Sequence, residues 1–366
     1  MRYYLIAGEA SGDLHGSNLI RALKAEDPGA EFRFRGGDLM AAEAGTAPVV
    51  HYREGAIMGF TAVLRKAGAL VSSLRSCQDD ILSWKPDAVI LIDYPGFNLR
   101  IARFCHIKHV KVFWYIAPKT WASRPGRNRE LKVYLDAMYI VFPFEIKYFE
   151  SVGVPFEYHG NPLVEAVDAH SFTRPCDGPY IALLPGSRGS EISRTMPVAM
   201  QVAGRLGRKV IVAGAPSRTP EDYTPYTAGH DNVEVVFGRT YDILKFADAA
   251  IINSGTASLE AALIGTPQVV CWSTSPFSAF IARKILHVLD NIEFISLGNL
   301  CLGREAFKEL IQEDFTAENL EAELKRITED DSCREKMLSD YKEIRALLGG
   351  DGASRAVARS MIEKLF

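Results

Sequence analysis

The chain has 366 residues, of which 48% are hydrophobic and 24% are charged, and its net charge is −3. This is the composition of a soluble globular protein of about two domains, and it offers no electrostatic argument for nucleic-acid binding. The six cysteines are scattered without a Cys-x-x-Cys pair, which argues against a zinc site or a disulfide framework and is typical of the cytosol. No apolar run approaches the roughly 18 residues that span a bilayer, and no secretory segment opens the chain, so we expect a soluble or peripheral protein.

The first half of the chain alternates predicted strands with predicted helices, which indicates an α/β fold with a parallel sheet covered on both faces. Strand patterns occur at residues 2–7, 31–35, 88–92, 110–116 and 138–142. The first strand leads into a turn with Gly8, Gly12 and Gly16, which lacks the Gly-x-Gly-x-x-Gly pattern of nicotinamide-binding domains. Small residues let a ligand approach closely, so Ser11 and Gly12 are candidate substrate-binding residues. A turn that serves packing alone is the alternative.

Residues 57–71 have an apolar helical stripe with basic residues beside it. Its members are Phe60, Val63, Leu64, Ala67, Leu70 and Val71. A stripe of this kind usually packs against a core. The more specific interpretation is a surface that rests on a membrane or holds an acyl chain.

The α/β pattern fades after Asn161-Pro162, in a stretch rich in Pro, Asp and Gly, and resumes at Tyr180. Further strand patterns occur at residues 180–184, 209–214, 233–237 and 249–253, and helical patterns at 316–328, 332–348 and 353–366. Two similar halves joined by a linker predict two Rossmann-like domains that face a cleft.

A phosphate site is indicated at residues 180–192, where an apolar strand is followed by a glycine turn and by a helix that we expect to begin at Glu191. The start of a helix offers unpaired N–H groups and a positive dipole end. Gly186 and Ser187 lie in the turn, and the planar guanidinium of Arg188 can hold two phosphate oxygens together. An ordinary turn with a solvent-facing arginine is the alternative.

A second such turn lies within residues 249–267, where Ser254 or Thr256 can cap a helix and the N–H groups of residues 255–258 are free for a phosphate. Glu260, one turn further on, can accept hydrogen bonds from both hydroxyls of a ribose. Together, the two turns on neighbouring strands favour a nucleoside diphosphate.

Asp93 is a candidate general base because it ends a predicted buried strand, at the edge where open α/β sheets bind ligands. The alternative is a turn-capping aspartate before Pro95-Gly96. Asn98 can orient a sugar or cap the next helix. The chain lacks a P-loop motif, an Asp-x-Asp motif and a metal-spaced histidine pair, so neither a metal nor another cofactor is implied.

Six sequence blocks carry a resemblance to a known family. They are AGEASGDLHG (7–16), IDYPGFN (92–98), WYIAPKTWASR (114–124), LLPGSRGSEI (183–192), NSGTASLEAALIGTP (253–267) and LGNLCLGRE (297–305). In order and spacing the chain resembles the lipid-A-disaccharide synthases over nearly its full length. The resemblance implies the GT-B glycosyltransferase fold, with an acceptor domain at residues 1–165 plus a returning helix at 350–366, and a UDP-sugar donor domain at 166–349.

Members of this family are peripheral proteins of the inner membrane of Gram-negative bacteria. The resemblance implies a cytoplasmic enzyme that joins UDP-2,3-diacylglucosamine to 2,3-diacylglucosamine 1-phosphate with inversion and without a required metal. The products are the β-1,6-linked lipid A disaccharide 1-phosphate and UDP. It favours the membrane interpretation of residues 57–71, with Phe60, Val63 and Leu64 as contacts, and it allows a homodimer.

Residue by residue, the resemblance makes Asp93 the base for the acceptor's 6-hydroxyl and places Arg188 on the UDP pyrophosphate. It gives Ser254, Gly255, Thr256 and Glu260 to the phosphate and ribose, and it places Asn299 at the donor pocket. One departure is His159-Gly160-Asn161-Pro162, where many relatives have Gly-His-Pro, so no role follows for a histidine directly before the proline.

Two rival interpretations remain at this point. One is another GT-B enzyme, such as a UDP-N-acetylglucosamine transferase or a UDP-N-acetylglucosamine 2-epimerase. Of these, the epimerase needs no apolar acceptor surface. The other is a UDP-sugar-binding membrane module without catalysis, against which Asp93 and Arg188 argue.

Overall fold

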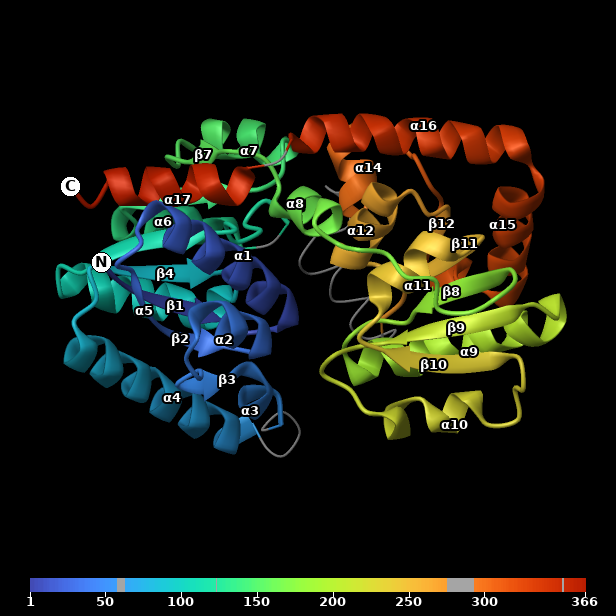
Figure 1. The fold of residues 1–366 in the computed structure, drawn as a ribbon, viewed down its shortest axis with the longest axis horizontal. Coiled ribbons are helices and arrows are strands. Elements are labelled where there is room, and N and C mark those ends of the chain that lie inside the picture. Colours follow the sequence, from blue (N-terminus) through green and yellow to red (C-terminus); the bar gives the residue numbers. More distant parts are fainter. Residues whose placement is uncertain (58–62, 123, 275–292, 351) are drawn as a thin grey trace. The chain divides into compact units, whose positions relative to one another are not determined.

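The chain forms two compact units, each built on a parallel sheet (Figure 1). The N-terminal unit comprises Met1–Glu165 together with Leu348–Phe366, and the C-terminal unit comprises Ala166–Leu347. The computed structural model describes residues 1–57, 63–122, 124–274, 293–350 and 352–366.

The sheet of the N-terminal unit has the strand order β3-β2-β1-β4-β5-β6-β7, and every pairing in it is parallel. Its strands are β1 (Arg2–Ala7), β2 (Glu31–Gly36), β3 (Val50–His51), β4 (Ala88–Ile92), β5 (Lys111–Tyr115), β6 (Ala137–Ile140) and β7 (Glu157–Tyr158). β4 has the sequence Ala-Val-Ile-Leu-Ile and is buried at every position, as expected of a central parallel strand with helices on both faces.

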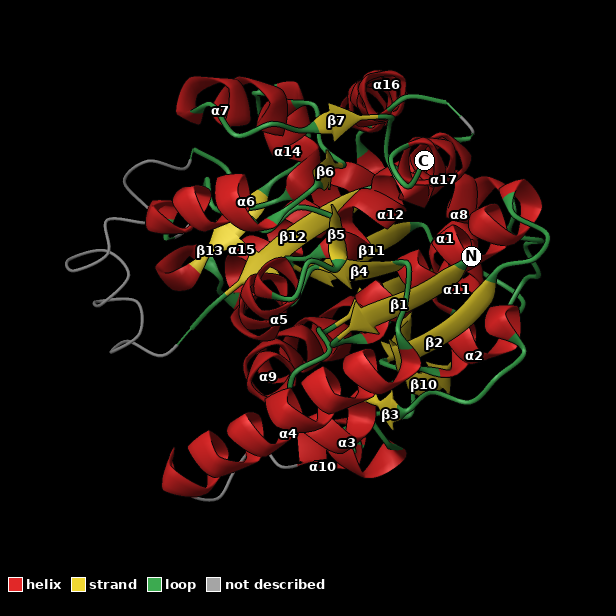
Figure 2. Ribbon diagram, turned by 90° about the vertical axis from the view of Figure 1, so that its left-hand side faces the viewer, coloured by secondary structure: helices red, strands yellow, loops and turns green. Residues whose placement is uncertain are grey.

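Helices pack around these strands (Figure 2). They are α1 (Ala10–Glu26), α2 (Asp38–Ala44), α3 (Tyr52–Ile57), α4 (Val63–Trp84), α5 (Pro95–Ile107), α6 (Asn128–Tyr134), α7 (Phe144–Val152), α8 (Pro162–Asp168) and α17 (Ala353–Glu363), with a 3-10 turn η1 (Pro125–Arg127). A core forms where strand residues such as Val89 and Trp114 meet Ile81 of α4 and Ile101 of α5, all of them fully buried. Burying side chains of this size stabilises the fold by about 1.5–3 kcal/mol each.

The last helix, α17, packs against α1 within the N-terminal unit (Figure 1). The hydroxyl groups of Ser360 and Tyr139 lie 3.0 Å apart, and the Nε of Arg359 donates to Glu26 at 2.9 Å. The backbone N–H of Ser354 donates to Glu165 at 2.8 Å. This confirms the expected return of the C-terminal helix to the first domain.

Asn161, in the segment that departs from the family pattern, is almost completely buried. Its side-chain oxygen accepts from the N–H of Leu163 in the first turn of α8 at 2.9 Å, and its amide donates to the carbonyl of Val141 at 3.0 Å. This asparagine therefore caps α8 and ties it to the end of β6, which is a structural role.

The C-terminal unit repeats the architecture, with the parallel strand order β10-β9-β8-β11-β12-β13. Its strands are β8 (Tyr180–Leu184), β9 (Lys209–Gly214), β10 (Val233–Phe237), β11 (Ala249–Asn253), β12 (Gln268–Trp272) and β13 (Glu309–Ile311). Its helices are α9 (Gly189–Leu206), α10 (Thr224–Thr227), α11 (Thr240–Phe246), α12 (Thr256–Ile264), α14 (Leu297–Leu302), α15 (Ala317–Glu329) and α16 (Asp331–Leu348), with 3-10 turns η2 (Pro220–Asp222) and η3 (Gln312–Asp314).

The strand orders place two pairs of loops together. β1 is paired with β4, and β8 is paired with β11. In each pair, the chain continues from one strand toward one edge of the sheet and from the other strand toward the opposite edge. Ligands of open α/β sheets bind at the carboxyl ends of the strands at such switch points. The expectation that the two phosphate-type turns follow neighbouring strands is confirmed by the pairing of β8 with β11.

Some elements differ from the sequence-based expectation. The helix after β8 begins at Gly189, two residues before Glu191, because the chain enters helical geometry directly after Arg188. The patterns did not predict β3, β7, β12 or β13, of which β3 and β7 have two residues each. So short a segment shows no hydrophobic period.

Candidate functional site

Asp93 directly follows β4, at the carboxyl edge of the N-terminal sheet. Asp93 and the next residue, Tyr94, both have a left-handed backbone, with φ of 41° and 49°. Residues other than glycine adopt this conformation only when the surrounding structure imposes it, and such strained positions cluster at functional sites. The chain then enters α5 at Pro95, whose fixed φ suits a first helical position.

The backbone of Asp93 accepts a hydrogen bond from Asn98, which is fully buried in α5. The Nδ2 of Asn98 donates to the carbonyl oxygen of Asp93 at 2.7 Å and to that of Ile92 at 3.3 Å. This arrangement favours a positioning role for Asn98 over direct contact with a sugar.

The turn after β1 lies beside Asp93. The ring of Tyr94 packs so closely on Gly8 that a Cβ at Gly8 would lie 2.4 Å from a ring atom. A Cβ on Gly12 would come within 3.1 Å of the Cβ of Ala7, so Gly12 is needed for packing of α1 on β1. Ser11 is partly exposed, and its hydroxyl donates to Glu9 at 2.8 Å. Of the two candidate residues here, Ser11 alone presents a polar side chain.

The loop after β5 contributes Lys119 and Trp121 to the same edge, and α7, which follows β6, contributes the buried carboxyl group of Glu145. The carboxylate of Glu145 accepts from the indole N–H of Trp121 at 3.1 Å and from two backbone N–H groups after β6 at 3.2 and 3.3 Å. Burial raises the pKa of Glu145 to about 7 despite these bonds. Two causes lower the pKa of His15 in α1 to about 4. The larger is burial of the imidazole, and the smaller is the positive charge of the exposed Lys119.

In the C-terminal unit, residues 185–188 connect β8 to α9, and the N–H groups of the last two of these residues converge on one carboxylate. The N–H groups of Ser187 and Arg188 donate to one oxygen of Glu191 at 2.9 and 3.0 Å. The guanidinium of Arg188 donates to the other oxygen at 3.0 Å. This turn therefore binds an anion, which in this structure is a carboxylate of the chain itself.

Gly186 makes this geometry possible. Its φ is 104°, and a Cβ at this position would lie 2.5 Å from the carboxylate of Glu191 and 3.0 Å from the amide of Asn253. A second arginine, Arg218, supports the turn, since its Nε donates to the carbonyl oxygen of Ser187 at 2.8 Å. The turn is thus fixed by both its N–H and its C=O groups.

The turn after β11 differs in detail from the expectation. Gly255, not Ser254 or Thr256, occupies the N-cap position of α12, and no side chain caps the helix there. The hydroxyl of Ser254 instead donates to the carbonyl of Ile295 at 3.3 Å. The N–H of Ser258 donates to the carbonyl of Gly255 at 3.3 Å, so this N–H group is not available to a phosphate as the sequence predicts.

Glu260 lies in α12 and accepts a hydrogen bond from the hydroxyl of Tyr241, in α11, at 3.0 Å. Burial raises the pKa of Glu260, and the hydrogen bond from Tyr241 opposes this change. The ring of Tyr241 packs edge-on against His170, with ring centroids 5.3 Å apart. Glu260 is thus a partly buried carboxyl group oriented by a tyrosine.

Asn299 is fully buried in α14, and all of its polar groups are engaged. Its amide donates to the carbonyl of Phe307 at 3.0 Å and to Glu309 at 2.9 Å, and its oxygen accepts from the N–H of Ala306 at 2.8 Å. Glu309 in turn accepts from the N–H of Ile295 at 2.8 Å. The structure thus favours a supporting role for Asn299 over the expected direct contact with the donor.

The predicted membrane contacts can be followed only in part. Phe60 lies outside the described residues, and so do the side chains of Val63 and Leu64. Within the described part of the stripe, Leu70 packs against the core of the N-terminal unit, whereas Val71 is 47% exposed. The stripe therefore divides between the core and the surface.

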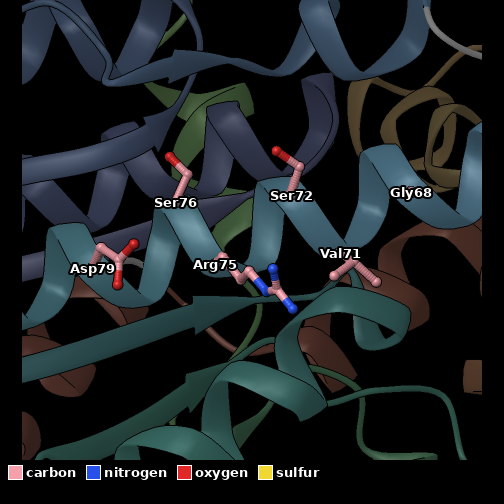
Figure 3. Close-up of a pocket in the computed structure, with 6 residues that line it drawn as sticks. All are labelled: Gly68, Val71, Ser72, Arg75, Ser76 and Asp79. Carbon is pink, nitrogen blue, oxygen red and sulfur yellow. The ribbon is translucent and has the colours of Figure 1, made fainter.

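Val71 lines an open hollow of about 630 Å³ beside α4. Its described lining residues all come from this helix and are Gly68, Val71, Ser72, Arg75, Ser76 and Asp79 (Figure 3). In Figure 3 the side chains of Val71 and Arg75 project to one side of the helix and those of Ser72 and Ser76 to the other. Among the helices whose residues are described, none is long and apolar enough to cross a bilayer.

No group of three or more His, Cys, Asp or Glu side chains that could hold a metal ion occurs in the described ranges. The sequence-based expectation that no metal is required stays a prediction.

In the C-terminal unit, the side chains that hold predicted site residues but were not themselves predicted include Glu191, Arg218, Tyr241 and Glu309. Glu191 has a recognisable signal, because a glutamate three residues after the N-cap often bonds back to the N-cap backbone. The other three are brought to the site by tertiary structure from elsewhere in the chain. No spacing pattern marks them.

Comparison with solved structures places the fold. The chain aligns with the UDP co-structure of MnaA from S. aureus with a TM-score of 0.72 and 13% identity, covering 100% of this chain and 97% of the other. It aligns with the calicheamicin glycosyltransferase CalG4 with a TM-score of 0.61 and 16% identity, covering 100% and 98%. These likenesses confirm the expected two-domain GT-B fold.

Comparison with known sequences identifies the family. Residues 3–361 match the family model described as Lipid-A-disaccharide synthetase. A lipid-A-disaccharide synthase of Myxococcus xanthus is 37% identical over 378 residues, covering 100% of this chain and 97% of the relative. One of Trichlorobacter lovleyi is 34% identical over 380 residues, covering 99% and 98%. This chain belongs to the lipid-A-disaccharide synthase family.

Proposed function

We propose that this chain is an inverting glycosyltransferase of lipid A biosynthesis. It joins UDP-2,3-diacylglucosamine to 2,3-diacylglucosamine 1-phosphate and releases the β-1,6-linked lipid A disaccharide 1-phosphate and UDP. The observation that carries this proposal is the family match along residues 3–361, together with full-length identity to lipid-A-disaccharide synthases.

Asp93 is the proposed general base. Its carboxylate takes the proton of the acceptor's 6-hydroxyl as that oxygen bonds to the donor's anomeric carbon, and the bond from this carbon to the β-phosphate oxygen breaks. Attack on the face opposite the leaving UDP inverts the configuration. The proposal is supported by the place of Asp93 at a switch point of the sheet and by its strained backbone, which Asn98 holds.

Arg188 and the N–H groups of the turn at Gly186 and Ser187 are the proposed site of the pyrophosphate. Negative charge accumulates on the phosphate oxygens as UDP leaves, and a guanidinium with oriented N–H groups at a helix start stabilises it. The support for this assignment is that the N–H groups of Ser187 and Arg188 and the guanidinium of Arg188 already bind a carboxylate in the structure.

Ser254, Gly255 and Thr256 are proposed to contact the second phosphate, since the turn that they form follows the strand next to β8. Glu260 is proposed to accept hydrogen bonds from the ribose hydroxyls. The hydrogen bond from Tyr241 supports this role because it fixes one carboxylate oxygen and leaves the other available for a ligand.

The acceptor and the donor both carry acyl chains, so we place the enzyme on the cytoplasmic face of the inner membrane. Phe60, Val63 and Leu64 are the proposed contacts. The exposed Val71 beside the hollow on α4 supports an apolar surface in this region. A homodimer also stands as a proposal, which light scattering of the purified protein would test.

The activity is tested by incubating the purified protein with both acylated substrates and analysing the products by mass spectrometry. Disaccharide 1-phosphate and UDP should appear in equal amounts. If the protein instead converts UDP-N-acetylglucosamine to its 2-epimer and forms no disaccharide, the proposal is wrong.

A further inference from the structure

Glu191 occupies the hydrogen-bond donors that the proposed pyrophosphate site needs. One of its carboxylate oxygens accepts from the N–H groups of both Ser187 and Arg188, at 2.9 and 3.0 Å. Its other oxygen lies 3.0 Å from the guanidinium of Arg188. A carboxylate and a phosphate are both negatively charged and bind the same donors, so both cannot occupy this turn.

We propose that the Glu191 carboxylate is an internal competitor for the donor's pyrophosphate. It holds the turn and Arg188 in their binding geometry, and it leaves them when the phosphates arrive. The inference rests on the proposed function, because it takes UDP as the ligand of this turn. It adds a residue that sets the affinity for UDP and the ease with which UDP is released.

The surroundings of Glu191 allow this exchange. Its side chain is 21% exposed and that of Arg188 is 68% exposed, so both reach solvent and can change rotamer. A salt bridge to so exposed an arginine contributes only about 0–1 kcal/mol. The two N–H groups that the carboxylate leaves are taken up by the arriving phosphate. The carbonyl of Ser187 is held separately by Arg218, which keeps the turn in place while Glu191 moves.

Gly186 contributes to this exchange between the carboxylate and a phosphate. Its missing side chain leaves the space that the Glu191 carboxylate fills, since a Cβ would lie 2.5 Å from one of its oxygens. A phosphate that replaces the carboxylate would use this space in the same way. The absence of a side chain at Gly186 therefore leaves room for either anion.

The test compares Glu191→Gln with the wild-type protein by titration calorimetry. The substitution removes the charge and keeps an acceptor oxygen, so we expect UDP to bind at least about fivefold more tightly because a like charge has been removed. Uridine, which lacks phosphates, should bind both proteins equally. Glu318→Gln is the matched control, because it removes the same charge from the Arg205–Glu318 pair near the far end of α9 and should leave UDP affinity unchanged.

The outcomes separate the two claims. If the wild-type protein does not bind UDP, the donor site itself is misassigned and the proposed function fails with it. If the wild type binds UDP but Glu191→Gln binds it equally or more weakly, Glu191 is a structural cap and only this inference is overturned. Should the variant fail to fold, a crystal structure of the wild type with UDP decides, since Glu191 still bonded to Ser187 beside the phosphates would contradict the exchange.

Discussion

Asp93 depends on its neighbours for the orientation that catalysis requires. Its left-handed backbone ends a fully buried strand, and the amide of Asn98 holds its carbonyl oxygen. We assign to Asn98 the positioning of the base, although the sequence also allowed a direct role in sugar binding.

Replacing Asn98 with alanine tests this assignment. The carbonyl groups of Ile92 and Asp93 lose a buried donor, which we expect to lower the free energy of unfolding by about 1–3 kcal/mol. The kcat of disaccharide formation should fall at least tenfold, with UDP affinity unchanged because the proposed UDP site lies in the other unit. A variant with lower stability but wild-type kcat would reduce Asn98 to a packing residue.

Glu145 gives the protein a specific pH dependence. Its pKa rises from 4.5 to about 7 on folding because burial disfavours the carboxylate. Folding therefore favours the protonated form, so its contribution to stability is complete below pH 4.5 and is lost as the pH rises through 7. The loss amounts to about 3 kcal/mol.

Urea unfolding of the wild type and of Glu145→Gln across this pH range measures the effect. The variant cannot titrate at this position, so its free energy of unfolding should fall less with pH than that of the wild type, whatever its absolute stability. Parallel curves for the two proteins would mean that Glu145 has an ordinary pKa in the fold.

Helix α4 shows how one sequence pattern can serve two purposes. Leu70 packs into the core and Val71 is exposed beside it, so neither the core interpretation nor the membrane interpretation covers the whole stripe. A helical period alone cannot tell which of two adjacent apolar residues faces solvent, because that depends on the neighbouring elements.

Liposome flotation tests the surface. Replacing Phe60, Val63 and Leu64 with serine should reduce association with anionic vesicles several-fold while the cooperative melting transition remains. Leu82→Ser is the matched control, since Leu82 is 43% exposed on the same helix and far along the chain from the stripe. Equal binding by both variants and the wild type would show that the stripe does not face a membrane.

The long elements could be predicted from the sequence, and the contacts at their ends could not. β4, β8 and β11 follow their apolar runs because a buried parallel strand is apolar on both faces. Propensity predicts Ser254 or Thr256 as the N-cap of α12, but Ser254 bonds instead to Ile295, which is distant in sequence. Such competition between local and tertiary partners is invisible in the sequence.

In the molecule as a whole, each unit carries a different part of the proposed reaction. The N-terminal unit supplies Asp93 and the C-terminal unit supplies Arg188 with the two phosphate turns. Asp93 and the residues of the two phosphate turns were recognisable because each of them follows a predicted buried strand. Glu191 was seen in the sequence only as the start of a helix, since its bonds to the preceding turn are a matter of geometry.

Because the two parts reside in different units, they can be removed one at a time. Arg188→Ala should weaken UDP binding at least tenfold, since it removes the guanidinium proposed to hold the pyrophosphate. Calorimetry with UDP measures this loss, and unchanged affinity would remove Arg188 from the donor site.

The central claim is that Asp93 is the base of a transfer reaction whose donor binds elsewhere in the chain. It is tested most directly by measuring disaccharide formation and UDP affinity together in Asp93→Asn. The account predicts wild-type UDP affinity and a transfer rate lowered by about 10²–10⁴, the contribution typical of a general base. Turnover near the wild-type rate would contradict it.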